Sequence, residues 1–434
     1  MIKRVRACHS VTGEITPPGD KSISHRAIIL NSIAGGKATI TNFSSGADCL
    51  STVACLQALG VEIRRQEPFD SPYLVEVSGD GKYGLMEPEN VLDAGNSATT
   101  IRLLTGLLAA QPFLSIFTGD SSLRSRPMAR LIHPLRLMGA DILGREHGAF
   151  APLVIKGTEL HGISYPLPIP SAQIKSAILI AALFAQGNTA LEEPTPSRDH
   201  TERLLKAMGV ELGRDGTRIT LTPPLNTLTP QSLHIPGDIS SAAYWLVAGA
   251  IHPHAKIKVR NCGINPTRTG IIDALLSMGA KIRIENQRTE GGEPVADLSA
   301  ESSDLVATEI SREMIPKLID EIPLIAVAAS MAKGITVIRD ASELRVKETD
   351  RINTTVKELS ILGARIEELP DGMVIRGGGG LQGTEVDSHH DHRLAMTLGI
   401  AALVAQGETT IHNAEAADIS YPTFWQDMER IATC

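Results

Sequence analysis

Apolar residues recur along the chain in a pattern that predicts one structural unit repeated several times. Five segments carry apolar positions three and four residues apart, then a Leu-Gly or Met-Gly pair, then alternating apolar and polar positions. Such a segment predicts an amphipathic helix that ends at a glycine and is followed by a strand. The glycines recur about every 70 to 84 residues, longer than a solenoid period, at Gly60, Gly139, Gly209, Gly279 and Gly363.

A second pattern lies between these helices. It is an apolar helix rich in small residues, followed by a turn and a strand rich in β-branched residues. The clearest copies begin at Ala177, Leu324 and Leu398, and weaker copies begin near Ala27, Leu103 and Ala243. We therefore expect six copies of one unit, with the sixth glycine-ended helix reduced to the C-terminal stretch FWQDMERIATC.

The tripeptide Pro-Gly-Asp indicates that three units form each half of the chain. It occurs at 18–20 and again at 236–238, and a Ser-rich helix start follows in both places. Pro-Gly favours a turn, and aspartate is a good helix N-cap. We therefore expect an α/β (α+β) protein of two similar domains, each with three units.

Composition and charge argue against several kinds of partner. With 42% hydrophobic and 21% charged residues, the chain has the make-up of a globular protein. No apolar run reaches the length of a membrane span, and the opening residues lack a secretory or transit-peptide pattern. A net charge of -8 and 3% aromatic residues argue against nucleic acid, which selects basic and aromatic surfaces. We expect no membrane and no nucleic-acid partner.

The cysteines and histidines favour neither disulfides nor a metal site. The five cysteines include no Cys-x-x-Cys pair, which fits a reducing cytoplasm. His389, His390 and His392 stand close together, but no second cluster has a spacing that completes a zinc site. We expect a cytoplasmic protein without a metal.

The loops before the small-residue helices carry unusual polar residues. They contain KSISHR from Lys21, GNSATTIR from Gly95, SAQIKS from Ser171, and shorter sets that include Asp238, Asp320 with Glu321, and Asp391 to Arg393. A helix N-terminus attracts anions through its free N–H groups and partial positive charge. Capping explains the hydroxyls and aspartates. It does not explain Lys21, Arg26, Lys175 or Arg393, whose charge opposes the helix dipole, so these cations indicate a bound anion.

Two further stretches are dense in charge. ELRVKETDR at 343–351 alternates cations with carboxylates, and SSLRSRPM at 121–128 is cationic. The first is either a solvated charged turn or part of the same anion site.

Together these stretches resemble the 5-enolpyruvylshikimate-3-phosphate (EPSP) synthases. The resembling sequences run in family order from residue 18 to 400: PGDKSISHRA, GNSATTIRLL, GDSSLRSRPM, SAQIKSA, SRDHTERLL, PGDISSAA, IDEIPLIAVAA, ELRVKETDRI and DHRLAMTLGI. The resemblance implies two inside-out α/β barrel domains, each of three βαβαββ repeats, with the ligand cleft between them. Domain I would comprise 1–19 plus 238–434, so that the first strand belongs with the C-terminal half, and domain II would comprise 20–237.

The resemblance also implies a reaction. Members of this family transfer the enolpyruvyl group of phosphoenolpyruvate to the 5-hydroxyl of shikimate 3-phosphate through a tetrahedral intermediate and release phosphate, in aromatic amino acid biosynthesis. No metal or organic cofactor is needed. Both substrates are anionic, so several lysine and arginine donors are required. We expect these two small molecules as partners of a monomer.

Motif matching implies a role for each site residue. For catalysis it implies Asp320 as the base, Glu348 as the acid that protonates the methylene group, and Lys21 in contact with both substrates, with Glu321 as the alternative base. The residues implied for shikimate 3-phosphate are Lys21, Ser22, Arg26, Ser171, Ala172, Gln173, Ser197, Arg198, Asp320 and Lys347. Those implied for phosphoenolpyruvate are Lys21, Asn96, Ala98, Arg126, Gln173, Arg351 and Arg393.

Two positions depart from the family pattern. Many members carry a lysine just before the terminal aromatic-Pro pair, where this chain has Ile419 and Ser420. We therefore expect the phosphate of phosphoenolpyruvate to depend more on Lys21 and Arg126. The family sequence GNSGTT is GNSATT here, and Ala98 adds a methyl group where the backbone meets the small ligand. Alanine there accompanies glyphosate insensitivity within the family, so we expect weak inhibition by glyphosate.

Two other functions stay open. The sister enolpyruvyl transferase that acts on UDP-N-acetylglucosamine shares the fold, but it generally carries a cysteine in the loop where this chain reads GDSSLRSRPM. The second is a non-catalytic anion-binding module, which the complete set of Lys21, Asp320, Glu348 and Arg393 disfavours.

Overall fold

The structure, a computed structural model, describes residues 1–66 and 73–433 and forms two compact units. Unit 1 comprises Met1–Pro18, Pro236–Thr289 and Pro294–Cys434, and unit 2 comprises Gly19–Ile235 and Glu290–Glu293. Each unit has its own hydrophobic core. No helix within the two described ranges is both long and apolar enough to cross a membrane.

Unit 2 contains three four-stranded sheets of one design. Its strands are β3 (Gly35–Thr41), β4 (Glu62–Gln66), β5 (Leu74–Asp80), β6 (Leu92–Asp93), β7 (Leu114–Thr118), β8 (Asp141–Gly144), β9 (Phe150–Lys156), β10 (Ser164–Pro166), β11 (Thr189–Glu192), β12 (Leu212–Asp215), β13 (Arg218–Leu221) and β14 (Leu233–His234). The sheet orders are β14-β3-β5-β4, β6-β7-β9-β8 and β10-β11-β13-β12. In each sheet the first pair is parallel and the next two pairs are antiparallel.

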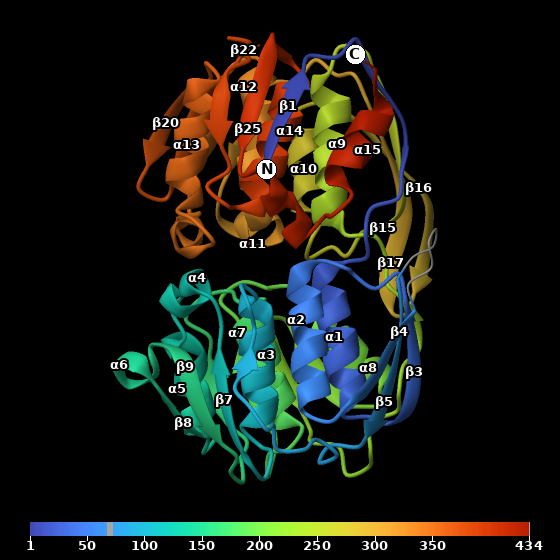
Figure 1. Cartoon of the computed structure of the whole chain (residues 1–434), viewed down its shortest axis with the longest axis vertical. Helices are drawn as coiled ribbons and strands as arrows, with labels where there is room; N and C mark the ends of the chain where they lie inside the picture. Colours follow the sequence, from blue (N-terminus) through green and yellow to red (C-terminus); the bar gives the residue numbers. More distant parts are fainter. Residues whose placement is uncertain (67–72, 434) are drawn as a thin grey trace. The chain divides into compact units, whose positions relative to one another are not determined.

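Three helices that are buried on nearly every side form the centre of unit 2. They are α1 (Lys21–Ser32), α3 (Ala98–Leu108) and α7 (Ala172–Ala182). The amphipathic helices are α2 (Ala47–Ala58), α5 (Ala129–Leu137) and α8 (His200–Ala207), and α4 (Ser121–Ser125) and α6 (Arg145–Gly148) are short. Helix α3 contacts both α1 and α7, and Figure 1 shows α3 beside α7. A Cβ atom at Gly106 of α3 would lie 2.3 Å from the Ala177 carbonyl oxygen of α7, so this close approach requires glycine.

Unit 1 repeats the arrangement with different elements. Its buried helices are α9 (Ile239–Ile251), α12 (Ile322–Met331) and α14 (His392–Ala402), and its other helices are α10 (Gly270–Ser277), α11 (Ile315–Leu318), α13 (Arg351–Ile361) and α15 (Phe424–Ile431). Short 3-10 helices are η1 (Arg312–Met314), η2 (Ile319–Glu321), η3 (Ser342–Val346) and η4 (Ala414–Ile419). The three buried helices contact one another. A helix that is apolar on all sides is stable only in an interior, so these sequences form the centre of the unit.

The N-terminal segment completes the sheets of unit 1. The strands of unit 1 are β1 (Ile2–Arg6) and β2 (Ser10–Ile15) from the N-terminal segment, followed by β15 (Ala255–Gly263), β16 (Lys281–Glu290), β17 (Glu293–Glu301), β18 (Glu309–Ile310), β19 (Ile335–Ile338), β20 (Arg365–Leu369), β21 (Gly372–Arg376), β22 (Leu381–Gln382), β23 (Glu385–Asp387), β24 (Ala405–Gln406), β25 (Glu408–His412) and β26 (Ala432–Thr433). The sheet orders are β16-β17-β15-β2-β26, β18-β19-β21-β20, β1-β25-β23 and β22-β24. Strand β1 (blue) pairs antiparallel with β25 (red), as Figure 1 shows. The first strand therefore lies with the C-terminal half, as the resemblance implied.

The five glycine-ended helices are confirmed. After α2, Gly60 has a φ of 85°, and its N–H donates to the Gln57 carbonyl at 3.0 Å. The next N–H, of Val61, donates to the Leu56 carbonyl at 3.0 Å. The same pair of bonds follows α5, α8, α10 and α13, where the glycines are Gly139, Gly209, Gly279 and Gly363. Both bonds satisfy helix-end carbonyls and need a left-handed residue, which explains the recurring glycine.

Candidate functional site

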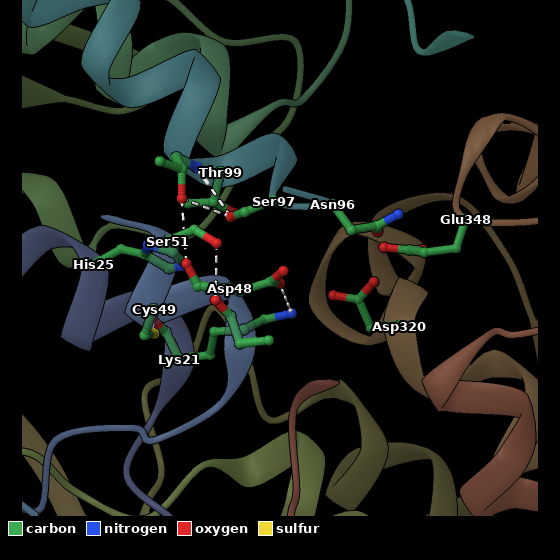
Figure 2. Close-up of polar contacts among 12 residues, drawn as sticks. Lys21, His25, Asp48, Cys49, Ser51, Asn96, Ser97, Thr99, Asp320 and Glu348 are labelled. Atoms are coloured by element: carbon green, nitrogen blue, oxygen red, sulfur yellow. Dashed lines mark hydrogen bonds and ion pairs between the residues drawn. The ribbon is translucent and has the colours of Figure 1, made fainter. Parts of the chain in front are cut away.

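The start of α1 places a lysine beside a carboxylate. Asp20 caps the helix by accepting the Ile23 N–H at 2.9 Å, and Lys21 is the first helical residue. The Lys21 ammonium lies 2.8 Å from a carboxylate oxygen of Asp48 in the first turn of α2 (Figure 2). Since the N-terminal end of a helix stabilises negative charge, Asp48 is a favourable fixed partner for this ammonium.

Arg26, one turn further along α1, is buried and bonded to three elements. Its Nη1 donates to the Ser22 carbonyl oxygen at 2.8 Å. Its Nε and Nη2 donate to the hydroxyls of Thr201 at 2.7 Å and Ser176 at 2.8 Å. The guanidinium therefore joins α1 to α8 and α7, and Ser22 contributes its backbone to this contact.

The start of α3 holds Asn96, Ser97 and Ala98 in order. Ser97 caps the helix with its side chain, and the buried Ala98 is the first helical residue. The Asn96 amide nitrogen donates to Asp120 at 2.7 Å, and its oxygen accepts from Arg126 at 2.8 Å. The amide is thus held at both ends, and Arg126 is kept at the start of α3.

The start of α7 is joined to α3 through a glutamine. Ser171 is the N-cap and Ala172 the first helical residue. The Gln173 amide nitrogen donates to the Thr99 hydroxyl at 2.9 Å, and its oxygen accepts from Arg102. The amide of Gln173 therefore has a fixed orientation.

Lys175 contradicts the sequence-based expectation. It is fully buried, and its ammonium lies 3.1 Å from Glu193 and 2.7 Å from Glu202. Because two carboxylates inside the protein balance this charge, the inference that Lys175 indicates a bound anion is wrong. Glu193 and Glu202 lie well after Lys175 in the sequence, so the sequence alone does not show that they pair with it.

The same cluster holds Ser197. The Lys175 ammonium donates to the Ser197 carbonyl oxygen at 3.2 Å, and the Ser197 backbone N–H donates to Glu193 at 3.0 Å. Its hydroxyl also donates to Glu193. The following residue, Arg198, is partly exposed. A buried ionic cluster therefore fixes the backbone that carries Arg198.

The charged residues of unit 1 converge on Arg351, the first residue of α13. Its buried guanidinium lies 2.7 Å from Asp391 and 3.4 Å from Asp320, and it also pairs with Glu348. Lys347 reaches the same Asp320 oxygen at 3.7 Å. Burial acts to lower the pKa of Arg351, but the three carboxylates outweigh it and hold the pKa above its ordinary value.

A second buried cluster forms around Glu321, the residue that follows Asp320 in the sequence. Glu321 accepts a hydrogen bond from the Ser240 hydroxyl and lies 3.7 Å from Nη1 of Arg393. Burial raises the pKa of the neighbouring Tyr244 to about 12, so this phenol stays protonated at neutral pH. The adjacent carboxylates Asp320 and Glu321 therefore differ in their ion pairs and hydrogen bonds, although both act on Arg393 electrostatically.

The sequence analysis missed the partners of two predicted site residues. Asp48 holds Lys21, and Asp391 holds Arg351. An acidic residue at a helix start is a common capping feature, so Asp48 did not stand out and Asp391 was noted only as one of the polar residues before a helix. The two pairings could only be found from the fold.

Ile419 and His389 both lie in unit 1. Ile419 ends η4 and packs, partly buried, against the core of unit 1, so it supplies no cation. His389 lies 2.8 Å from Glu358 through its Nε2. Within residues 1–66 and 73–433, no group of three or more His, Cys, Asp or Glu side chains could hold a metal ion.

Comparison with known proteins gives matches along the whole chain. The family model of EPSP synthase (3-phosphoshikimate 1-carboxyvinyltransferase) matches residues 5–428. The chain is 55% identical to the 3-phosphoshikimate 1-carboxyvinyltransferase of Roseiflexus castenholzii, over 99% of this chain and 100% of that protein. It is 53% identical to the protein of the same name from Bacillus cereus, over 98% of this chain and 97% of that protein. The solved EPSP synthase of Acinetobacter baumannii matches with a TM-score of 0.87 and 42% identity, over 99% of this chain and 98% of that one.

Proposed function

The chain belongs to the EPSP synthase family, and on that premise we propose that it transfers the enolpyruvyl group of phosphoenolpyruvate to the 5-hydroxyl of shikimate 3-phosphate. The reaction is an addition followed by an elimination. The hydroxyl loses its proton as it attacks the central enol carbon, and the methylene group gains a proton. The resulting methyl group then returns a proton as phosphate leaves the tetrahedral intermediate. The site therefore needs a base and an acid.

The main support for the proposal is the set of carboxylates around Arg351. Asp320 and Glu348 share this guanidinium, and Asp320 also has Lys347. An anionic substrate competes with the carboxylates for Arg351, and a carboxylate that loses its paired cation binds a proton more tightly. Glu348 then carries the proton that the methylene group receives. Asp320 keeps Lys347 and acts as the base.

Glu321 is the alternative base. It is buried and already accepts from Ser240, with Arg393 close by. These contacts favour a role in holding Arg393 rather than in proton transfer. Asp320 is more exposed than Glu321, which supports its assignment as the group that meets the 5-hydroxyl.

Unit 2 supplies most of the binding groups in this proposal. Lys21 is held by Asp48, and Asn96 is held by Asp120 and Arg126, so their orientation is set before substrate arrives. The Ser197 hydroxyl already donates to Glu193. It is left to accept a hydrogen bond, which a hydroxyl of shikimate 3-phosphate can donate.

Two finer points belong to the same proposal. The buried methyl group of Ala98 at the start of α3 supports weak inhibition by glyphosate. The four described cysteines are free thiols, which supports a cytoplasmic location. Cys434 lies outside the described residues. The monomeric state stays a prediction.

Phosphate release tests the function directly. The purified protein is given phosphoenolpyruvate with either shikimate 3-phosphate or, as the control, UDP-N-acetylglucosamine. We expect phosphate only with shikimate 3-phosphate. Release with the nucleotide sugar alone would identify the sister transferase, and release with neither would favour the non-catalytic module.

A further inference from the structure

A line of buried polar side chains joins the first three helices of unit 2. His25 of α1 has its Nδ1 2.7 Å from the Thr52 hydroxyl of α2. That hydroxyl lies 2.7 Å from the Thr100 hydroxyl of α3, which donates to the Ser97 hydroxyl at 2.7 Å. All four side chains have an exposed fraction of 0%. Figure 2 shows the two ends of the line, His25 and Ser97.

The ring of His25 sets the direction in which this line donates. Burial lowers the pKa of His25 to about 3, so the ring is neutral and carries one N–H. Its Nε2 has no hydrogen-bond partner among residues 1–66 and 73–433. A buried N–H without an acceptor is rarer than a buried lone pair without a donor, which favours the hydrogen on Nδ1. Nδ1 then donates to Thr52, Thr52 to Thr100, and Thr100 to Ser97.

The line ends at the start of α3. The Ser97 hydroxyl accepts both the Thr100 hydroxyl and the Thr100 N–H, the latter at 3.2 Å. The Thr100 hydroxyl also lies 3.3 Å from the backbone oxygen of Asp48, whose carboxylate holds Lys21. The hydroxyl line thus connects the first turn of α3 with α2 through Thr52 and with α1 through His25.

We propose that His25 is a positioning residue for phosphoenolpyruvate, because it fixes the N-cap of α3, and with it Asn96 and Ala98, through Thr52 and Thr100. The inference rests on the proposed assignment of Asn96 and Ala98 to that substrate. His25 itself is buried and acts only through the hydroxyl line. Loss of the line shifts a few atoms at the helix start, which matters most for the smaller ligand that contacts this backbone.

The test removes one hydroxyl from the middle of the line. Thr52→Val keeps the shape of the side chain and breaks the line, whereas Thr52→Ser keeps the hydroxyl. Thr52→Val breaks the hydrogen bonds of Thr52 with His25 and with Thr100. If the start of α3 thereby loses the equivalent of about one net hydrogen bond to phosphoenolpyruvate, the KM for that substrate rises about five- to tenfold. We expect the KM for shikimate 3-phosphate and kcat to stay within about twofold, and Thr52→Ser to restore the KM for phosphoenolpyruvate.

Thr105→Val is the matched control. Thr105 is equally buried in α3, but its hydroxyl donates to the Ile101 carbonyl of its own helix and lies outside the line. A second pair, His25→Asn and His25→Leu, asks the same question from the end of the line, since only asparagine can donate to Thr52. Thermal melting shows that each variant is folded. We expect the asparagine variant to have the lower KM for phosphoenolpyruvate.

The proposal is overturned if Thr52→Val raises the KM for phosphoenolpyruvate and the KM for shikimate 3-phosphate together. It is also overturned if Thr52→Val and Thr105→Val have the same KM for phosphoenolpyruvate and the two His25 variants do not differ in that KM. These outcomes differ from a failure of the proposed function, in which the unmodified protein makes no phosphate from the two substrates. If Ala98→Gly changes the KM for phosphoenolpyruvate while the hydroxyl line does not, only the positioning role is wrong.

Discussion

Unit 2 and unit 1 begin their first buried helices alike but place different groups there. Both α1 and α9 follow Pro-Gly-Asp, and Asp20 and Asp238 each accept a backbone N–H from the first turn. The next residue is Lys21 in α1 and the apolar Ile239 in α9. The cap is therefore part of the repeated scaffold, and the functional group next to it differs between the copies.

The contrast extends to the other helix starts. In unit 2 they hold amides, hydroxyls and cations with fixed partners, as at Asn96 and Gln173. In unit 1 the charges gather around Arg351, where Asp320 and Glu348 are the partly exposed carboxylates. Under the proposed assignment one scaffold supports two tasks, with most of the substrate-binding groups in unit 2 and the proton-transfer groups in unit 1.

The largest effect is expected in unit 1. Asp320→Asn removes the proposed base and keeps its size, so kcat is expected to fall by about 10²- to 10⁴-fold. The initial rate of phosphate release measures this. Asp304→Asn is the control, because Asp304 is an exposed carboxylate of the same unit. Near-full turnover of the Asp320 variant would contradict the base assignment and make Glu321 the better choice.

A large effect on stability is expected from Lys175 in unit 2. Lys175→Met leaves Glu193 and Glu202 buried without their main cation, which costs about 3 to 5 kcal/mol in the free energy of unfolding. Urea unfolding measures this loss. The double variant Lys175→Met/Glu202→Gln removes one charge of each sign and is expected to recover part of the stability. A fully stable Lys175→Met protein that no longer binds substrate would show that Lys175 acts on the ligand after all.

A smaller effect is expected at Lys21. Lys21→Met removes the proposed charge-assisted contact with each substrate, so kcat/KM is expected to fall by about 10- to 100-fold for both. Steady-state kinetics with each substrate varied in turn checks this. Lys37→Met, at an exposed position of β3, is the control. A change in only one of the two KM values would restrict Lys21 to that substrate.

The smallest effect concerns Ala98. Ala98→Gly removes the methyl group at the start of α3, and glyphosate is expected to inhibit the variant about tenfold more strongly, the effect of one modest steric contact. Inhibition curves at fixed phosphoenolpyruvate measure it. The idea fails if the unmodified protein is already inhibited at low micromolar glyphosate, or if the substitution changes nothing.

Much of the fold could be predicted because the repeats carry local signals. Gly60 and its four counterparts stand where a left-handed residue must come after a helix. The sequences of α7, α12 and α14 are apolar on all sides, and such helices can only lie in an interior. The pairing of β1 with β25 joins opposite ends of the chain. No local pattern indicates such a pairing, and the resemblance alone implied that the first strand belongs with the C-terminal half.

The site could be predicted less completely. The motifs predict Lys21 and Arg351 as site residues, but the pairing of these cations with Asp48 and Asp391 is visible only in the fold. Charge at a helix start is also ambiguous: Lys175 shares this feature with Lys21, yet its charge is neutralised inside the protein. Sequence position alone does not distinguish the fully buried Lys175 from the partly exposed Lys21, although both have a carboxylate partner.

Glu348→Gln tests the proposal that the proton transfers take place in unit 1. A single turnover is followed by rapid quench, while binding of shikimate 3-phosphate to the same variant is measured by calorimetry. We expect binding within about threefold of the unmodified protein and a chemical step slower by about 10²-fold or more. A chemical step at the normal rate, or a loss confined to binding, would contradict it.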